Sequence, residues 1–131
     1  MHLKLLTHER VIFDDDVDEI YTKSVDGEFG ILKDHVPIMS ALDVGVTKAV
    51  QGNKVFFFTT MGGVLQFKDN NAVILTDTAE TGKDIDITRA KAAKERAEAR
   101  LADLKAEIDI KRAEAALARA KARLKAAASG N

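Results

Sequence analysis

The hydrophobic and polar positions of the chain follow two patterns, and one gives way to the other near residue 83. Before that point, short stretches rich in Val, Ile, Phe and Thr recur between turn residues, with a spacing of roughly 8 to 12 positions that is typical of small all-β folds. Beyond it, alanine and charged residues recur at helical spacing. The two patterns predict an α+β protein with segregated halves.

The first half has the pattern of a β-sandwich or barrel built from short antiparallel strands. All six Phe residues and the single Tyr lie here, so the sizeable hydrophobic core belongs to this half. Gly52-Asn53, between two apolar runs, predicts a tight hairpin turn. Gly62-Gly63 predicts a bend or bulge. We expect strands at residues 3–7, 17–25, 44–50, 55–60, 64–68 and 72–76.

The second half has the composition of a helix, because residues 84–128 contain no Gly, Pro or aromatic residue. Apolar positions form two runs with three-and-four spacing, and the step from Ile108 to Ala113 turns the second run away from the first. We therefore expect two antiparallel helices with facing alanine seams, the first opening at Asp86 and the second near Asp109. The turn has no Gly or Pro, so one continuous helix also fits the pattern.

Charge divides the chain at the same place. Residues 1–83 carry 8 basic and 13 acidic side chains, whereas residues 84–131 carry 12 basic and 8 acidic ones. The residue patterns predict a β-sandwich domain over 1–83 and a helical domain over 84–131, and the charge contrast predicts that the two have different partners. The absence of cysteine excludes a disulfide framework and thiolate metal ligands. No apolar run reaches the roughly 18 residues of a membrane span, so a soluble, cytoplasmic chain is expected.

Few constellations of side chains indicate catalytic or metal chemistry. The acidic cluster at residues 14–19 lacks the alternating ligands and closing Glu of a calcium loop, so we expect a solvated turn and no metal site. His35 lies beside the only proline without a nucleophile or an orienting acid, which favours a structural or interface role. Thr81-Gly82-Lys83 lacks the first glycine and the closing Ser or Thr of a phosphate loop. We expect no catalytic residue.

Four arginines of the helical half fall on shared helix faces. Arg89 and Arg96 are seven residues apart in the first helix, and Arg119 and Arg123 are four apart in the second. Folding the hairpin would bring the two pairs together, and arginines beside a helix N-terminus can bind phosphate. A solvated charged face paired with neighbouring glutamates fits the same pattern. The residues alone leave both interpretations open.

Three further stretches of the chain form distinctive motifs: Gly27–Leu32 with His35 and Pro37, the stretch Met61-Gly62-Gly63-Val64, and residues 84–92, which contain the pattern Asp-x-x-Arg-Ala. The three stretches resemble the epsilon subunit of bacterial F-type ATP synthase, and the third is similar to a motif of ATP-binding epsilon subunits. The order of strands and hairpin matches over essentially the whole chain. The resemblance implies a β-sandwich that contacts the gamma subunit and the ring of c subunits, within a complex at the cytoplasmic face of the bacterial cell membrane.

The resemblance also implies that the hairpin regulates the enzyme without being catalytic itself. Folded on the sandwich it is permissive, and extended along gamma toward the alpha and beta subunits of the catalytic head it blocks ATP hydrolysis. In ATP-binding members the nucleotide, alone or with Mg²⁺, holds the hairpin down. Its contacts correspond to Glu80, Ile85, Asp86 and Ala90 around base and ribose, and to Arg89, Arg96, Arg119 and Arg123 around the phosphates.

Two other classes of function agree less well with the sequence. A nucleic-acid-binding module is the alternative, because the alanine-rich helical half has an excess of lysine and arginine over acidic residues. The interspersed acids and the lack of a basic, aromatic-studded β face argue against it. A freestanding enzyme would need a paired acid and base, a thiol, a phosphate loop or a metal cluster, and the sequence has none of these.

Overall fold

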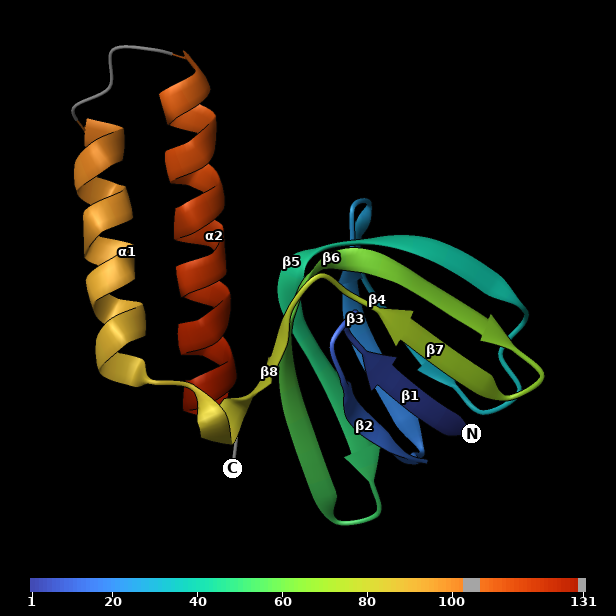
Figure 1. Cartoon of the computed structure of the whole chain (residues 1–131). Helices are drawn as coiled ribbons and strands as arrows, with labels where there is room; N and C mark the ends of the chain where they lie inside the picture. Colours follow the sequence, from blue (N-terminus) through green and yellow to red (C-terminus); the bar gives the residue numbers. More distant parts are fainter. Residues whose placement is uncertain (103–106, 130–131) are drawn as a thin grey trace.

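The computed structural model describes residues 1–102 and 107–129. Within these residues, strands occupy the first part of the chain and two α-helices the second (Figure 1). The predicted class, a β-sandwich followed by a helical hairpin, is confirmed. The elements are β1 (His2–Leu6), β2 (Val11–Asp16), β3 (Glu19–Ser24), β4 (Gly27–Leu32), β5 (Ile38–Gln51), β6 (Lys54–Lys68), β7 (Asn71–Leu75), β8 (Ala79–Thr81), the 3-10 helix η1 (Gly82–Asp84), α1 (Ile87–Ala102) and α2 (Glu107–Ser129).

The two layers of the sandwich are parts of one sheet that folds over itself. Its strand order is β2-β1-β7-β6-β5-β3-β4, and β8 pairs with β6 outside this path. Neighbouring strands are antiparallel apart from the parallel pair β1 and β7. Strands β5 and β6 contain 14 and 15 residues and run through both layers, joined at the predicted Gly52-Asn53 turn. The hairpin-turn prediction is therefore confirmed.

The sheet bends at Gly62-Gly63, as predicted. Leu42 pairs with Gly63 and Val44 with Met61, so the ladder between β5 and β6 is interrupted in between. Both glycines have positive φ, 79° at Gly62 and 113° at Gly63. Glycine adopts these angles without steric cost. The bend lets one half of β6 pair with β7 and the other half with β8.

The core lies between the two layers of this sheet. Leu3, Leu65 and Ile74 are fully buried on one layer, and Ile20 and Phe58 are buried on the other. Three threonine hydroxyls form a chain inside the sandwich: Thr22 is 2.8 Å from Thr47, which is 3.1 Å from Thr60. Because these buried hydroxyls are partnered, they add no unsatisfied polar group. The sandwich is thus a packed platform for the hairpin.

Strands β2, β4 and β8 were not predicted, and the acidic cluster was assigned to the wrong kind of element. Residues 14–16 lie in β2, an edge strand, and not in a turn. The carboxylates at these positions are exposed to solvent, and β1 places basic side chains opposite them, with Lys4 across from Asp14 and His2 across from Asp16. Acidic residues are acceptable in a strand at such an edge because it is solvated on its outer side.

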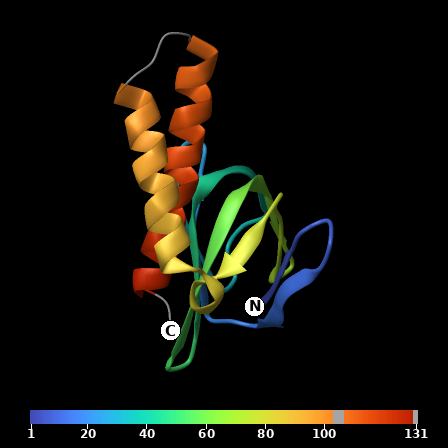
Figure 2. The same ribbon diagram turned by 60° about the vertical axis from the view of Figure 1, so that its left-hand side comes forward.

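The helices form the predicted antiparallel hairpin, in which α2 lies beside the sandwich and α1 on the far side of α2 (Figures 1 and 2). Asp86 caps α1 as predicted, since its Oδ1 accepts the Arg89 N–H at 3.0 Å. Helix α2 begins at Glu107, slightly before the predicted start at Asp109. The connection between the two helices, residues 103–106, lies outside the described residues. No described helix is long and apolar enough to cross a membrane.

Two alanine stripes run along α2. The first includes Ala113 and Ala120, which are buried at positions of the predicted seam. The second includes Ala122 and Ala126, which are buried although no seam was predicted there. Ala126 packs in a cluster with Ile85 and Val46, so this second stripe docks the hairpin on the sandwich.

Candidate functional site

The segment that joins the sandwich to α1 is held by local hydrogen bonds. In β8, the Glu80 N–H donates to Thr59 Oγ1 at 3.0 Å. In the next turn, Thr81 Oγ1 donates to Asp84 Oδ2 at 2.8 Å. Ile85 then inserts its side chain into the cluster beneath α2 and is 8% exposed. These contacts fix where α1 begins.

A cavity of about 390 Å³ lies where the start of α1 meets the end of α2. Figure 1 shows these two helix ends next to η1. The volume of the cavity is within the range of small-ligand sites. The side chains that line it come from β8, η1, both helices and the segment between η1 and α1: Glu80, Asp84, Ile85, Asp86, Arg89, Ala90, Ala93, Arg96 and Arg123.

One ion pair crosses this cavity between the hairpin and the sandwich. Arg123 Nε donates to Glu80 Oε1 at 2.7 Å, and the two side chains are 30% and 36% exposed. An ion pair with this degree of exposure contributes at most about 1 kcal/mol. It nevertheless orients the Arg123 guanidinium, which retains four further N–H donors for other acceptors.

The other charged side chains of the cavity differ in whether they have a partner. Asp86 caps α1 and Asp84 accepts the Thr81 hydroxyl, so both carboxylates have local partners. Arg89 and Arg96 are exposed, and neither has an acidic partner within 4 Å among the described residues. Guanidinium groups in this position can form bidentate hydrogen bonds with phosphate. The cavity is therefore suited to an anion with several oxygens.

Most of the residues expected to bind ATP are brought together here. Arg119 is the exception: it is half-buried, one helical turn before Arg123, and does not line the cavity. Asp84 and Ala93 line the cavity but were not predicted. Both could have been found from spacing, because Asp84 opens the motif at residues 84–92 and Ala93 follows Arg89 by one helical turn.

The remaining candidates for chemistry are metal-ligating side chains and His35. Among the described residues, no group of three or more His, Asp or Glu side chains is placed to hold a metal ion. His35 packs its ring edge-on against Phe67, with 5.9 Å between ring centroids, and its Nδ1 lies 2.6 Å from the Val36 carbonyl oxygen. These contacts give His35 a structural role, one of the two roles expected for it.

The fold and the cavity define a class of two-part protein, a β-sandwich with a docked helical hairpin and an arginine-lined cavity where the two meet. Residues 1–82 match the β-sandwich domain of the ATP synthase Delta/Epsilon chain, and residues 83–128 match its long α-helix domain. The chain belongs to the ATP synthase epsilon-chain family, whose members are subunits of the central stalk of F-type ATP synthases.

Curated relatives carry the same description. The chain is 46% identical over 99 residues to the ATP synthase epsilon chain of Desulforamulus reducens, covering 76% of this chain and 75% of the relative. It is 41% identical over 107 residues to that of Halalkalibacterium halodurans, covering 82% and 80%. These matches give no support to the nucleic-acid-binding alternative.

Solved structures of large assemblies contain similar chains. One is in the Euglena gracilis mitochondrial ATP synthase, OSCP/F1/c-ring in rotational state 1, with a TM-score of 0.84 and 26% identity, covering 96% of this chain and 79% of that one. Another, in the central stalk and c-ring of the Tetrahymena thermophila enzyme, has a TM-score of 0.69 at 17% identity and shows likeness of fold alone.

Proposed function

We propose that this subunit couples the c-ring to the gamma subunit and regulates ATP hydrolysis through a hairpin that ATP stabilises in the docked position. In this proposal residues 1–83 form the coupling domain and residues 84–131 the regulatory one. The subunit itself is non-catalytic, and it associates with the cytoplasmic face of the bacterial cell membrane only through the complex.

The observation that carries the proposal is the shared cavity of the two helices. Arg89 and Arg96 reach it from α1, and Arg123 reaches it from α2. An ATP triphosphate that engages all three would link the start of α1 to the end of α2. Ile85 and Ala90 also line the cavity and would contribute apolar surface for the base. Such a ligand fits the docked hairpin and loses its site when the helices separate.

The weak packing of the hairpin supports regulation by a ligand. The docking stripe consists of alanine side chains, which bury little apolar area. A ligand that binds only the docked state stabilises that state by about 2.7 kcal/mol at a hundredfold excess over its dissociation constant. Stabilisation of this size is sufficient to decide between two hairpin positions that differ by a few kcal/mol.

Exposed apolar side chains of the sandwich support the proposed rotor contacts. Val64, on β6, pairs with Leu75, on β7, and the two are 44% and 40% exposed. Val36 and Met39, near the start of β5, are 70% and 69% exposed. Neighbouring exposed apolar groups are typical of protein interfaces. We assign these two surfaces to gamma and the c-ring, while the extended hairpin contacts the alpha and beta subunits of the head.

The test is a calorimetric titration of the purified chain with Mg-ATP and with ATP alone, beside Arg89→Ala, Arg123→Ala and Arg100→Ala. Arg100 is an exposed arginine of α1 that does not line the cavity, so it controls for loss of charge alone. We expect one equivalent of ATP to bind without turnover, and the first two substitutions to weaken binding at least tenfold while Arg100→Ala changes it little. No binding at millimolar ATP, or equal effects of all three substitutions, would overturn the proposal.

A further inference from the structure

A groove runs along α2 on the side of the docking stripe away from Arg123. It consists of two adjoining cavities of about 350 and 260 Å³ that share Glu28, Val46 and Lys125. At about 100° per residue, Lys121 and Lys125 lie on one side of the docking stripe formed by Ala122 and Ala126. Arg119 and Arg123 lie on the other side. The groove is therefore separate from the proposed nucleotide cavity.

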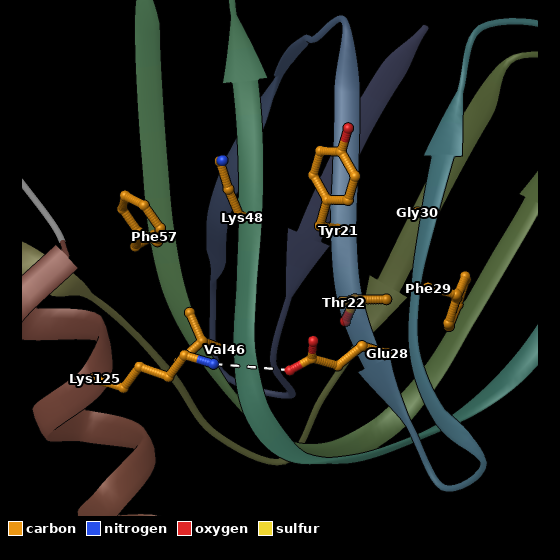
Figure 3. A pocket seen from close by; sticks show the side chains of 9 residues that line it. All are labelled: Tyr21, Thr22, Glu28, Phe29, Gly30, Val46, Lys48, Phe57 and Lys125. Carbon is orange, nitrogen blue, oxygen red and sulfur yellow. Dashed lines mark ion pairs between the residues drawn. The ribbon is translucent and has the colours of Figure 1, made fainter.

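The floor of the groove is apolar. Tyr21 and Phe57 line it together with Val46, on three neighbouring strands of one layer (Figure 3). Gly30 lies opposite Tyr21 and leaves room for its ring, because a Cβ at Gly30 would be 2.8 Å from a ring carbon. Tyr21 is 39% exposed, which leaves part of its ring open to the groove.

The rim of the groove is cationic. Four lysines line the two cavities, from β3, β5 and α2, against a single carboxylate, Glu28. Lys125 Nζ lies 3.7 Å from Glu28 Oε1, and both side chains are well exposed (Figure 3). Neither Lys48 nor Lys121 has an acidic partner within 4 Å in the part of the chain that the structure describes. Lys48 Nζ lies 5.6 Å from the centre of the Tyr21 ring.

From this juxtaposition we propose that the groove binds a small anionic amphiphile, with an acyl chain on the aromatic floor and a carboxylate or phosphate head among the lysines. Apolar floor and cationic rim match the two parts of such a molecule, and lysine side chains present an apolar stem with a charged end. The anionic head would replace Glu28 as the partner of Lys125.

Binding would engage both halves of the protein. Tyr21 and Lys48 belong to the sandwich, whereas Lys121 and Lys125 belong to α2. A ligand held by both sets binds the docked hairpin better than the undocked one and so shifts the hairpin toward the docked position. The groove thus adds a second regulatory site that does not depend on nucleotide.

The experiment uses laurate below its micelle concentration, with dodecyltrimethylammonium and decyl maltoside as cationic and uncharged controls. Binding is followed by backbone NMR shifts and by melting temperature. We expect saturable laurate binding, shifts at Gly30, Val46 and Phe57, and a higher melting temperature with laurate than with either control. Shifts centred on Val36 and Met39, equal binding of all three probes, or no saturation would overturn the proposal.

Charge variants distinguish a specific binding site from non-specific binding of the amphiphile. Lys121→Gln should weaken laurate binding about two- to fivefold, as expected for loss of one exposed charge contact. Glu28→Gln should strengthen it by a similar factor, because it removes the competing carboxylate. Arg89→Ala should leave laurate binding unchanged, which keeps this test distinct from that of ATP binding. A Glu28→Gln variant that binds more weakly contradicts the proposed head position.

Discussion

Arg123 Nε donates a hydrogen bond to Glu80 Oε1 across 2.7 Å, although 43 positions separate the two residues in the sequence. The pair joins the last part of α2 to β8, and through β8 to the pairing with β6. It places a carboxylate next to one of the arginines expected to bind phosphate. Glu80 therefore compensates the positive charge of Arg123 when no anion is bound.

Replacing Glu80 with Gln should loosen the docked hairpin. Loss of a partly exposed ion pair costs about 0.5 kcal/mol, and the effect should shrink between 0.1 and 1 M salt. Amide hydrogen exchange in α2 measures the change. Glu98→Gln, at an exposed position of α1 with no ion-pair partner among the described residues, is the matched control. Equal exchange in both variants at low salt would show that the pair does not hold the hairpin.

Enlarging Ala126 should undock the hairpin and leave the sandwich folded. Ala126 is fully buried against Ile85 and Ala90, so Leu at this position must displace one of them. Overpacking of this kind costs about 1 to 3 kcal/mol. NMR spectra should show perturbed signals in α2 but unperturbed ones in β1 and β7. Ala128→Leu, at an exposed position two residues further on, should have little effect.

Substitution of Gly63 should destabilise the sandwich itself. A Cβ at this position would lie 2.1 Å from the Leu75 carbonyl oxygen, and the φ of +113° is unfavourable for other residues. We expect Gly63→Ala to lower the free energy of unfolding by at least about 2 kcal/mol. Gly52 also has a positive φ, but nothing lies within 4 Å of a Cβ added there. Gly52→Ala should therefore lower the free energy of unfolding by only about 1 kcal/mol. Urea denaturation compares the two variants.

The pairing of β1 with β2 should depend on pH through His2. Hydrogen bonds from the His2 ring to the carboxylates of Asp14, which has the larger effect, and Asp16 raise the pKa of His2 above 6.5 in the folded protein. A raised folded-state pKa means that the stabilisation is fully present below pH 6.5 and disappears as the pH rises through the folded-state value.

Melting temperatures of the wild type and His2→Gln between pH 5 and pH 9 test this dependence. We expect the wild type to be more stable at the acidic end and the two curves to converge as the pH rises. His8, which is exposed in the connection between β1 and β2, provides the control variant His8→Gln. A constant difference over the whole range would contradict the role of the His2 charge.

The sequence predicted the elements with strong periodicity and missed those whose register depends on partners. Alanine spacing was sufficient for the hairpin and for the seam through Ala113 and Ala120. The stripe at Ala122 and Ala126 escaped detection because its neighbour, Val46, is distant in the chain. Strand β2 was missed because three consecutive aspartates are unfavourable in strands in general, and only its edge position next to His2 and Lys4 makes them acceptable.

The candidate site shows the same limit. Spacing on each helix grouped the arginines in pairs, and the cavity includes both members of the first pair. It includes only Arg123 of the second, because the rotation of α2 about its own axis is set by the docking stripe and not by the arginines. That rotation depends on the sandwich surface, which helix periodicity does not describe.

The three-residue strand β8 fixes the fulcrum of the hairpin. Its ladder to Phe58, Thr59 and Thr60 ties it to the sandwich, and α1 begins a few residues later at Ile87. With 16 residues, α1 is a lever arm of about 24 Å. A rotation of roughly 10° at the fulcrum moves its far end by about 4 Å at that arm length. Small rearrangements around Ile85 and Asp86 are thereby amplified into displacements large enough to make or break contacts with a neighbouring subunit.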